Sequence, residues 1–228
     1  MENRQLTLNV RIPDRCSLGN FVAGDNSELV SRLADLVEER APSDCIFVWG
    51  PAGSGKSHLL RAVCHAAPDR SQYLSLAKPD LLPEELTAFT EAALVCIDDI
   101  DTVVGNPEWE TALLALYERA RGRTTLVLAA RAAPQALPFR LPDLQSRLRA
   151  GLVYGLRVLS DEQKLEALQV RARDRGFELP GEAGIYVLSR YPRDMHALFA
   201  LLDRLDDATL RAQRRITVPF LRSLEEQA

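Results

Sequence analysis

Apolar residues along the chain form two alternating patterns. Runs rich in apolar residues and of strand length occupy five segments, at residues 45–49, 73–76, 94–97, 125–130 and 152–156. Apolar residues at helical spacing occupy the stretches before and between them, at residues 26–40, 56–67, 83–90 and 108–121. Asp25 or Asn26 is expected to cap the first helix, and Pro42 to end it. This alternation predicts an α/β fold, a mostly parallel sheet with helices on both faces.

The pattern changes near Ser160. Ser160 and Gln163 have the spacing of a capping box, which predicts a helix that ends at Gly176. Three more helical stretches follow, at residues 180–190, 192–205 and 217–226. We therefore expect three parts, an N-terminal tail at residues 1–12, an α/β core at residues 13–158 and a small all-helical lid domain at residues 159–228.

Composition narrows the class of protein. The chain is 46% hydrophobic and 26% charged, which is ordinary for a globular protein with a real core. Its formal net charge of -4 argues against a protein whose main work is to grip DNA phosphates. The four cysteines form no C-x-x-C pair, and no apolar signal segment opens the chain. We expect a cytoplasmic protein with no membrane-spanning helix.

A glycine-rich loop links the first predicted strand to a helix. Its residues are Gly50, Pro51, Ala52, Gly53, Ser54, Gly55, Lys56 and Ser57. Glycines let the backbone curl so that successive N–H groups point at phosphate oxygens, and the helix N-terminus adds partial positive charge. Lys56 is expected to reach the terminal phosphates and Ser57 to ligate Mg²⁺. The alternative is a strand-to-helix turn that holds no ligand.

A second apolar run ends in two carboxylates. Residues 94–97 are followed by Asp98 and Asp99, which a parallel sheet would deliver to the edge where the glycine loop lies. Asp98 is expected to hold Mg²⁺, and Asp99 to orient an attacking water. Either aspartate alone is also a common cap or turn residue.

With these motifs in place, the chain resembles the DnaA-like branch of the AAA+ family over nearly its whole length. Four segments carry the resemblance, at residues 21–26, 48–60, 141–148 and 191–195. It implies that Phe21, Val22 and His58 line the nucleotide site, with ADP or ATP as ligand. It also implies that Arg193 is the lid arginine called sensor 2, and that Arg147 is an arginine finger. The alternative for Arg147 is a surface arginine on a helix, paired with Asp143.

Within that branch, the chain is most similar to regulatory inactivators of DnaA. Gln5, Leu6 and Leu8 resemble a motif that binds the DNA polymerase III sliding clamp, and residues 171–180 and 212–220 resemble the lid sequences. The chain also stops after the lid, where the initiator continues into a DNA-reading domain. The resemblance implies an adaptor that binds the clamp and DnaA, forms a homo-oligomer and contacts DNA only through the loaded clamp. An edge strand is the alternative for the tail.

Some residues depart from the pattern of these inactivators. Asn9 and Val10 stand where the clamp motif usually ends in Pro-Leu, and Ala130 or Arg131 stands where the family places a polar sensor-1 residue. The intact loop and Asp99 keep open a self-sufficient AAA+ ATPase, such as a helicase loader or remodelling factor. The adaptor hypothesis instead predicts weak or absent ATPase activity of its own. A DNA-binding initiator fragment is a third possibility, which the net charge disfavours.

Overall fold

The computed structural model describes residues 16–40, 44–90, 92–212 and 215–225. Its centre is a five-stranded sheet with the strand order β2-β3-β4-β1-β5, in which every pairing is parallel. The strands are β1 (Cys45–Trp49), β2 (Ser71–Ser75), β3 (Leu94–Asp98), β4 (Thr125–Ala130) and β5 (Leu152–Gly155). The predicted parallel α/β fold is therefore confirmed.

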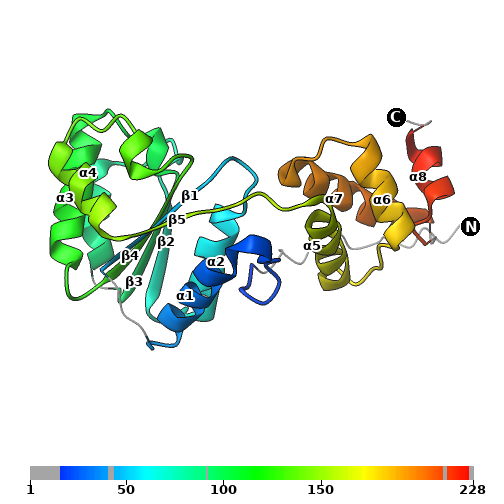
Figure 1. Cartoon of the computed structure of the whole chain (residues 1–228), viewed down its shortest axis with the longest axis horizontal. Helices are drawn as coiled ribbons and strands as arrows, with labels where there is room; N and C mark the ends of the chain where they lie inside the picture. The colour runs from blue at the N-terminus through cyan, green and yellow to red at the C-terminus, as the bar shows by residue number, and fades with distance from the viewer. Residues whose placement is uncertain (1–15, 41–43, 91, 213–214, 226–228) are drawn as a thin grey trace, which may run out of the picture.

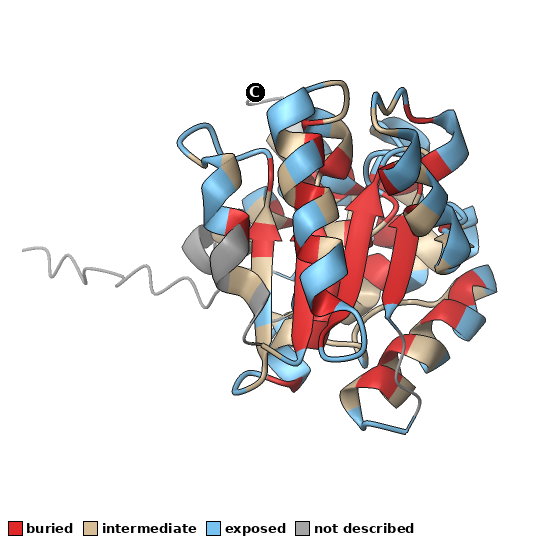
Figure 2. Cartoon of the chain, turned by 90° about the vertical axis from the view of Figure 1, so that its left-hand side faces the viewer, coloured by how far each residue is buried: buried red, intermediate tan, exposed pale blue. Residues whose placement is uncertain are grey.

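Helices cover both faces of the sheet (Figure 1). On one face lie α1 (Ser27–Val37) and α2 (Lys56–Ala66), and on the other lie α3 (Pro107–Ala120) and α4 (Pro142–Ala150). Short 3-10 turns complete this part, at η1 (Gly24–Asn26), η2 (Pro83–Thr90), η3 (Ile100–Thr102) and η4 (Pro134–Ala136). The central strands are continuous apolar runs because both of their faces are buried, and Figure 2 shows them as a buried block.

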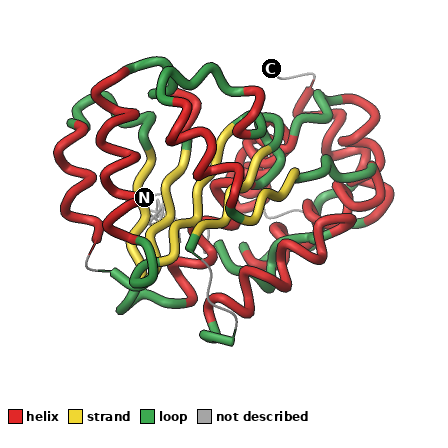
Figure 3. Tube along the Cα trace, turned by 60° about the vertical axis from the view of Figure 1, so that its left-hand side comes forward, coloured by secondary structure: helices red, strands yellow, loops and turns green. Residues whose placement is uncertain are grey.

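The last four helices form a body of their own to one side of the sheet (Figures 1 and 3). They are α5 (Asp161–Asp174), α6 (Gly181–Arg190), α7 (Met195–Ala212) and α8 (Val218–Glu225). The predicted capping box of Ser160 and Gln163 is present, and α7 buries Met195, Leu198 and Leu202 in a separate apolar cluster. None of the helices in the described part of the chain is long and apolar enough to span a bilayer.

Residues of the core contact the lid and the linker that leads to it. Val22, which the sequence assigned to the core, packs against the apolar cluster of the lid. Asn26 precedes α1 as expected, but its side chain does not cap the helix. Instead, its amide donates to the carbonyl of Arg157 at 3.1 Å and accepts from the Arg157 N–H at 2.8 Å. Asn26 thus ties the start of α1 to the linker between core and lid.

Helix α4 carries the predicted arginine finger and was not predicted as an element. Only Leu144 and Leu148 on it are buried, which is too few to give a helical pattern. The carboxylate of Glu110 on α3 anchors its start. Glu110 is fully buried and accepts backbone N–H bonds from Gly105 at 2.7 Å, Arg140 at 2.9 Å and Leu141 at 2.7 Å.

Replacing Glu110 by alanine should lower the free energy of unfolding by about 2–4 kcal/mol, since three backbone N–H groups would lose their buried carboxylate acceptor. Urea denaturation followed by circular dichroism measures this change. Glu108, exposed in the first turn of the same helix, provides the control. Glu108→Ala should cost about 1 kcal/mol or less. Equal losses in the two variants would contradict the anchoring role.

Candidate functional site

The glycine-rich loop leaves the carboxyl end of β1 and leads directly into α2. Gly53 and Gly55 adopt φ angles of 74° and 100°, a left-handed backbone that other residues rarely take. Gly55 has a second constraint, because an added Cβ would lie 2.6 Å from Cε2 of Phe21. The two glycines therefore shape a tight cradle of backbone N–H groups at the N-terminus of α2, as the sequence predicts.

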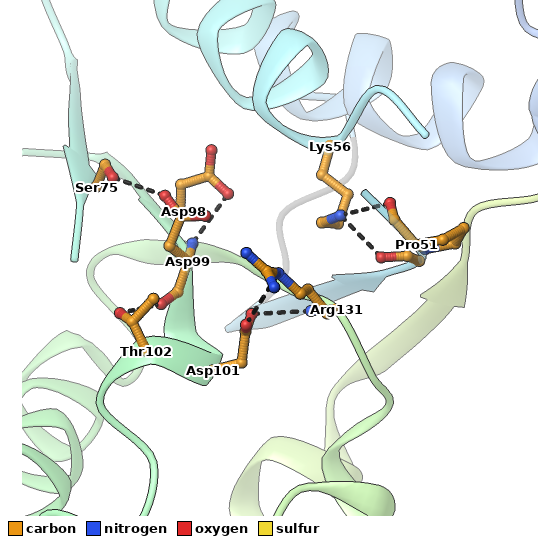
Figure 4. A network of polar contacts seen from close by, with 9 residues as sticks. Pro51, Lys56, Ser75, Asp98, Asp99, Asp101, Thr102 and Arg131 are labelled. Carbon is orange, nitrogen blue, oxygen red and sulfur yellow. Dashed lines mark hydrogen bonds and ion pairs between the residues drawn. The ribbon is translucent and has the colours of Figure 1, made fainter. Parts of the chain in front are cut away.

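Lys56 is the first residue of α2 and is largely buried within the cradle. Its ammonium donates to the carbonyls of Gly50 at 2.8 Å and Pro51 at 2.9 Å (Figure 4). Burial lowers the pKa of Lys56, while the Asp98 carboxylate opposes that shift. The Oγ atom of Ser54 is also buried and has no hydrogen-bond partner among the described residues. The loop thus contains a buried ammonium, that of Lys56, and a buried hydroxyl, that of Ser54.

Asp98 ends β3 and is 1% exposed. Its Oδ2 accepts from the Tyr73 hydroxyl at 3.0 Å, and its Oδ1 accepts from the N–H of Asp99 at 2.9 Å. Burial raises the pKa of Tyr73, and the charge of Asp98 adds to the rise, so the phenol remains a donor at neutral pH. Tyr73 therefore fixes the orientation of the carboxylate expected to hold a metal ion.

Asp99 lies beside Asp98 but is held differently. Its φ of 60° is uncommon for a residue other than glycine. Its Oδ2 accepts from the Ser75 hydroxyl at 2.7 Å. Figure 4 shows Ser75 and Lys56 on opposite sides of the acidic pair, so the Asp99 carboxylate is directed toward β2. Its predicted role in orienting water remains a prediction.

The sequence did not single out Tyr73 and Ser75. They stand two residues apart on β2, and Ser75 is in register with Asp98. Residues two apart share a face of a strand, so both hydroxyls reach the same side of β3. The signal is visible only once β2 is known to pair with β3, since the strand itself resembles any half-buried edge strand.

Arg131 follows β4, which lies between β1 and β3. Its backbone N–H donates to Asp101 at 2.9 Å, and its Nε lies 3.4 Å from the same carboxylate. Figure 4 shows the guanidinium between Asp101 and Lys56. The strand order thus brings Arg131 to the space between loop and acidic pair, where a sensor-1 residue is expected. The sequence does not assign that role to Arg131, and its position alone does not show it.

Phe21 and His58, which are expected to line the nucleotide site, lie next to the loop. The rings of Phe21 and His58 lie 5.6 Å apart, and Phe21 packs against Gly55. Nε2 of His58 is 3.1 Å from the carbonyl oxygen of Ser17, which ties α2 to the segment before Phe21. Val22 meets the lid cluster, so this segment touches both the loop and the lid.

Arg193 and Arg147 are both paired with carboxylates. Arg193, just before α7, donates to Asp161 at 2.7 Å and is largely exposed.

Arg147 pairs with Asp143 at 3.2 Å and with Glu118, and its guanidinium lies 5.9 Å from the centre of the Tyr117 ring. This is the surface pairing that the sequence left as the alternative. The structure therefore does not place Arg147 beside the chain's own loop. Gln5, Leu6 and Leu8 lie outside the described residues.

Comparison with known proteins gives two family matches. Residues 161–224 match the model for the lid domain of Hda, and residues 46–152 match the model of the ATPase family associated with various cellular activities. Together the two models span most of the described chain.

Solved structures share the fold. Domain III of the replication initiation protein DnaA from Thermotoga maritima superposes with a TM-score of 0.78 at 20% identity, covering 91% of this chain and 94% of that one. AMPPCP-bound DnaA from Aquifex aeolicus gives 0.71 at 20% identity, with 84% and 65% covered. The RuvB Holliday junction branch migration motor of Thermotoga maritima gives 0.71 at 20% identity, with 92% and 71% covered.

The Tyr73 hydroxyl offers a direct test of the site geometry. Tyr73→Phe should lower the free energy of unfolding by about 1–3 kcal/mol, because a buried carboxylate loses a donor while the ring and its packing remain. Thermal and urea unfolding measure the loss. Tyr154→Phe is the matched control, since Tyr154 packs on the same apolar cluster from edge strand β5. The assignment fails if the two variants change stability equally.

Proposed function

Because this chain is a DnaA-like AAA+ protein with a lid of the Hda type, we propose that it is a nucleotide-bound negative regulator of replication initiation. In this proposal it engages the DNA sliding clamp and stimulates ATP hydrolysis by DnaA. The observation that carries the proposal is the match of residues 161–224 to the Hda lid. The DnaA structure bound to AMPPCP supports a nucleotide as ligand of the shared fold.

The loop and its neighbours suit a nucleoside diphosphate or triphosphate. The N–H groups around Gly53 and Gly55 would hold the phosphates, and Lys56 would exchange its loop carbonyls for phosphate oxygens. Ser57 and Asp98 offer the hydroxyl and carboxylate oxygens that Mg²⁺ prefers, and the bond from Tyr73 keeps Asp98 oriented. When bound, Mg²⁺ neutralises phosphate charge.

The base and the lid make the remaining contacts in this proposal. Phe21, Val22 and His58 would contact the base, with Arg193 approaching the phosphates from the lid.

Arg147 acts on a second molecule in this proposal. Gly122, just after α3, donates its N–H to the carboxylate of Asp44 at 3.2 Å, and Gly151, just after α4, lies against the carbonyl of Cys45. The ends of α3 and α4 that carry Tyr117 and Arg147 therefore lie near the start of β1. The loop leaves the other end, five residues or about 16 Å of strand away. From there Arg147 would reach the ATP of a neighbouring DnaA and stabilise the charge that develops on the transferred phosphoryl group.

Asp99 favours a second candidate, an AAA+ ATPase that turns over ATP by itself as a helicase loader or remodelling factor would. The acidic pair is complete, and Asp99 stands at the end of β3. The bond from Ser75 supports slow turnover instead, because it directs the Asp99 carboxylate toward β2. Steady-state ATP hydrolysis by the isolated protein, compared with hydrolysis by DnaA plus DNA-loaded clamp, separates the two candidates.

Arg147→Ala should leave nucleotide binding unchanged and reduce the stimulation of DnaA hydrolysis by a factor of about 10³–10⁵ when the arginine step limits the rate. Arg147→Lys should recover little, since an ammonium lacks the planar fork of a guanidinium. Arg149→Ala, exposed on the same helix, is the control and should retain stimulation. Phosphate release by DnaA in the presence of loaded clamp is the measurement. Full stimulation by Arg147→Ala would refute the finger assignment.

Gln5→Ala should weaken clamp association, because the amide of Gln5 is the specific polar group of the proposed peptide and Leu6 and Leu8 are its apolar anchors. A short peptide of this kind binds with a dissociation constant of about 1 μM, so loss of the amide should be visible by surface plasmon resonance. Glu2→Ala, which changes the tail outside the motif, should bind normally. Undiminished clamp binding by Gln5→Ala would rule out the peptide as the clamp ligand.

A further inference from the structure

Asp194 brings a negative charge from the lid to the glycine-rich loop. It stands directly before α7 and caps that helix, because its Oδ1 accepts from the N–H of Ala197 at 3.0 Å. Its other carboxylate oxygen faces the loop. A Cβ added at Gly53 would lie 2.6 Å from Asp194 Oδ2 and 3.6 Å from the backbone nitrogen of Met195.

The groups around Gly53 attract the negative charge of the Asp194 carboxylate. Gly53 presents a bare Cα in the middle of a loop whose N–H groups, helix N-terminus and Lys56 favour an anion. Within the described part of the chain, Asp194 has no cationic partner, and the adjacent Arg193 pairs with Asp161. Asp194 therefore places a carboxylate where the loop attracts negative charge.

A polyphosphate on the loop would meet this carboxylate as a like charge. Repulsion between like charges grows with the charge of the ligand, and a nucleoside triphosphate carries one unit more than a diphosphate. The cap bond fixes the carboxylate to the first turn of α7, so it withdraws only if the lid moves with it. Through Asp194, the charge of a bound nucleotide would therefore act on the position of α7.

We propose that Asp194 is a specificity-determining residue that weakens nucleotide binding and does so more for the triphosphate than for the diphosphate. This inference rests on the proposed nucleotide binding at residues 50–57. It biases the chain toward holding ADP, and it makes release of the lid from Gly53 part of triphosphate binding.

Asp194→Asn tests the proposal, because asparagine has nearly the same shape and caps helices as well as aspartate does. We expect the dissociation constant for ATP to fall about three- to tenfold and that for ADP to fall less. The gain should shrink as NaCl is raised from about 0.05 M to about 0.5 M, since salt screens exposed charges. Isothermal titration calorimetry with each nucleotide and Mg²⁺ measures both effects.

Two further variants separate charge from fold. Asp194→Ser also keeps a capping oxygen but is smaller, and should tighten ATP binding in the same direction. Glu182→Gln removes one exposed negative charge from α6 of the same lid and should leave both affinities unchanged. Thermal unfolding confirms that each variant is folded.

The outcomes distinguish this inference from the proposed function. If the unaltered protein binds ATP and ADP, but Asp194→Asn and Asp194→Ser bind them no more tightly, the role of Asp194 is wrong and nucleotide binding stands. An equal gain for ATP and ADP, or the same gain from Glu182→Gln, also overturns it. If the unaltered protein binds neither nucleotide, the proposed function falls and this inference falls with it.

Discussion

The parallel pairing of β4 between β1 and β3 is the constraint on which the site depends. Parallel strands end at the same edge of a sheet, so this order brings the loop after β1, the acidic pair of β3 and Arg131 after β4 to one place. Asp99, whose φ of 60° is uncommon for a residue other than glycine, lies at this edge. Strain of this kind persists only where the surroundings hold it, and here the buried strands provide that support.

The segment of residues 16–26 contacts both the glycine-rich loop and the lid. It contacts α2 through His58, packs Val22 into the lid cluster and ends at Asn26, whose amide bonds the linker at Arg157. Asn20 adds a bond of 2.8 Å to Asp174 at the end of α5. A ligand that shifts Phe21 against Gly55 therefore acts on a segment already bonded to both bodies. Because these contacts are hydrogen bonds and a few apolar side chains, they can rearrange without loss of either core.

The sequence predicted the helices and strands whose residue pattern is local. It missed the contacts that depend on which strands pair and on where the lid meets the core. The bounds of β1 and β4 were right because buried strands are unbroken apolar runs. The glycine-rich loop was identifiable from the sequence because its glycines are required by the local backbone conformation, which no distant residue determines. Helix α4 was missed, since it buries only two leucines. Tyr73, Ser75 and Asp194 were missed because their partners lie on another strand or another body, a relation that no local pattern contains. Asn26 is a residue type that often caps helices, but its side chain bonds the backbone of Arg157 instead.

The placement of Arg147 argues for action between molecules. It lies near the amino end of β1, because Gly151 at the end of α4 lies against Cys45, while the phosphate loop lies at the carboxyl end, so no rotamer of one side chain spans the two. Its present partners, Asp143 and Glu118, are partly exposed, and such surface pairs contribute about 1 kcal/mol or less each. A phosphoryl group in transfer offers a guanidinium far more than that. The proposed role of Arg147 toward a neighbour's nucleotide is consistent with this placement, whereas a role at the chain's own loop is not.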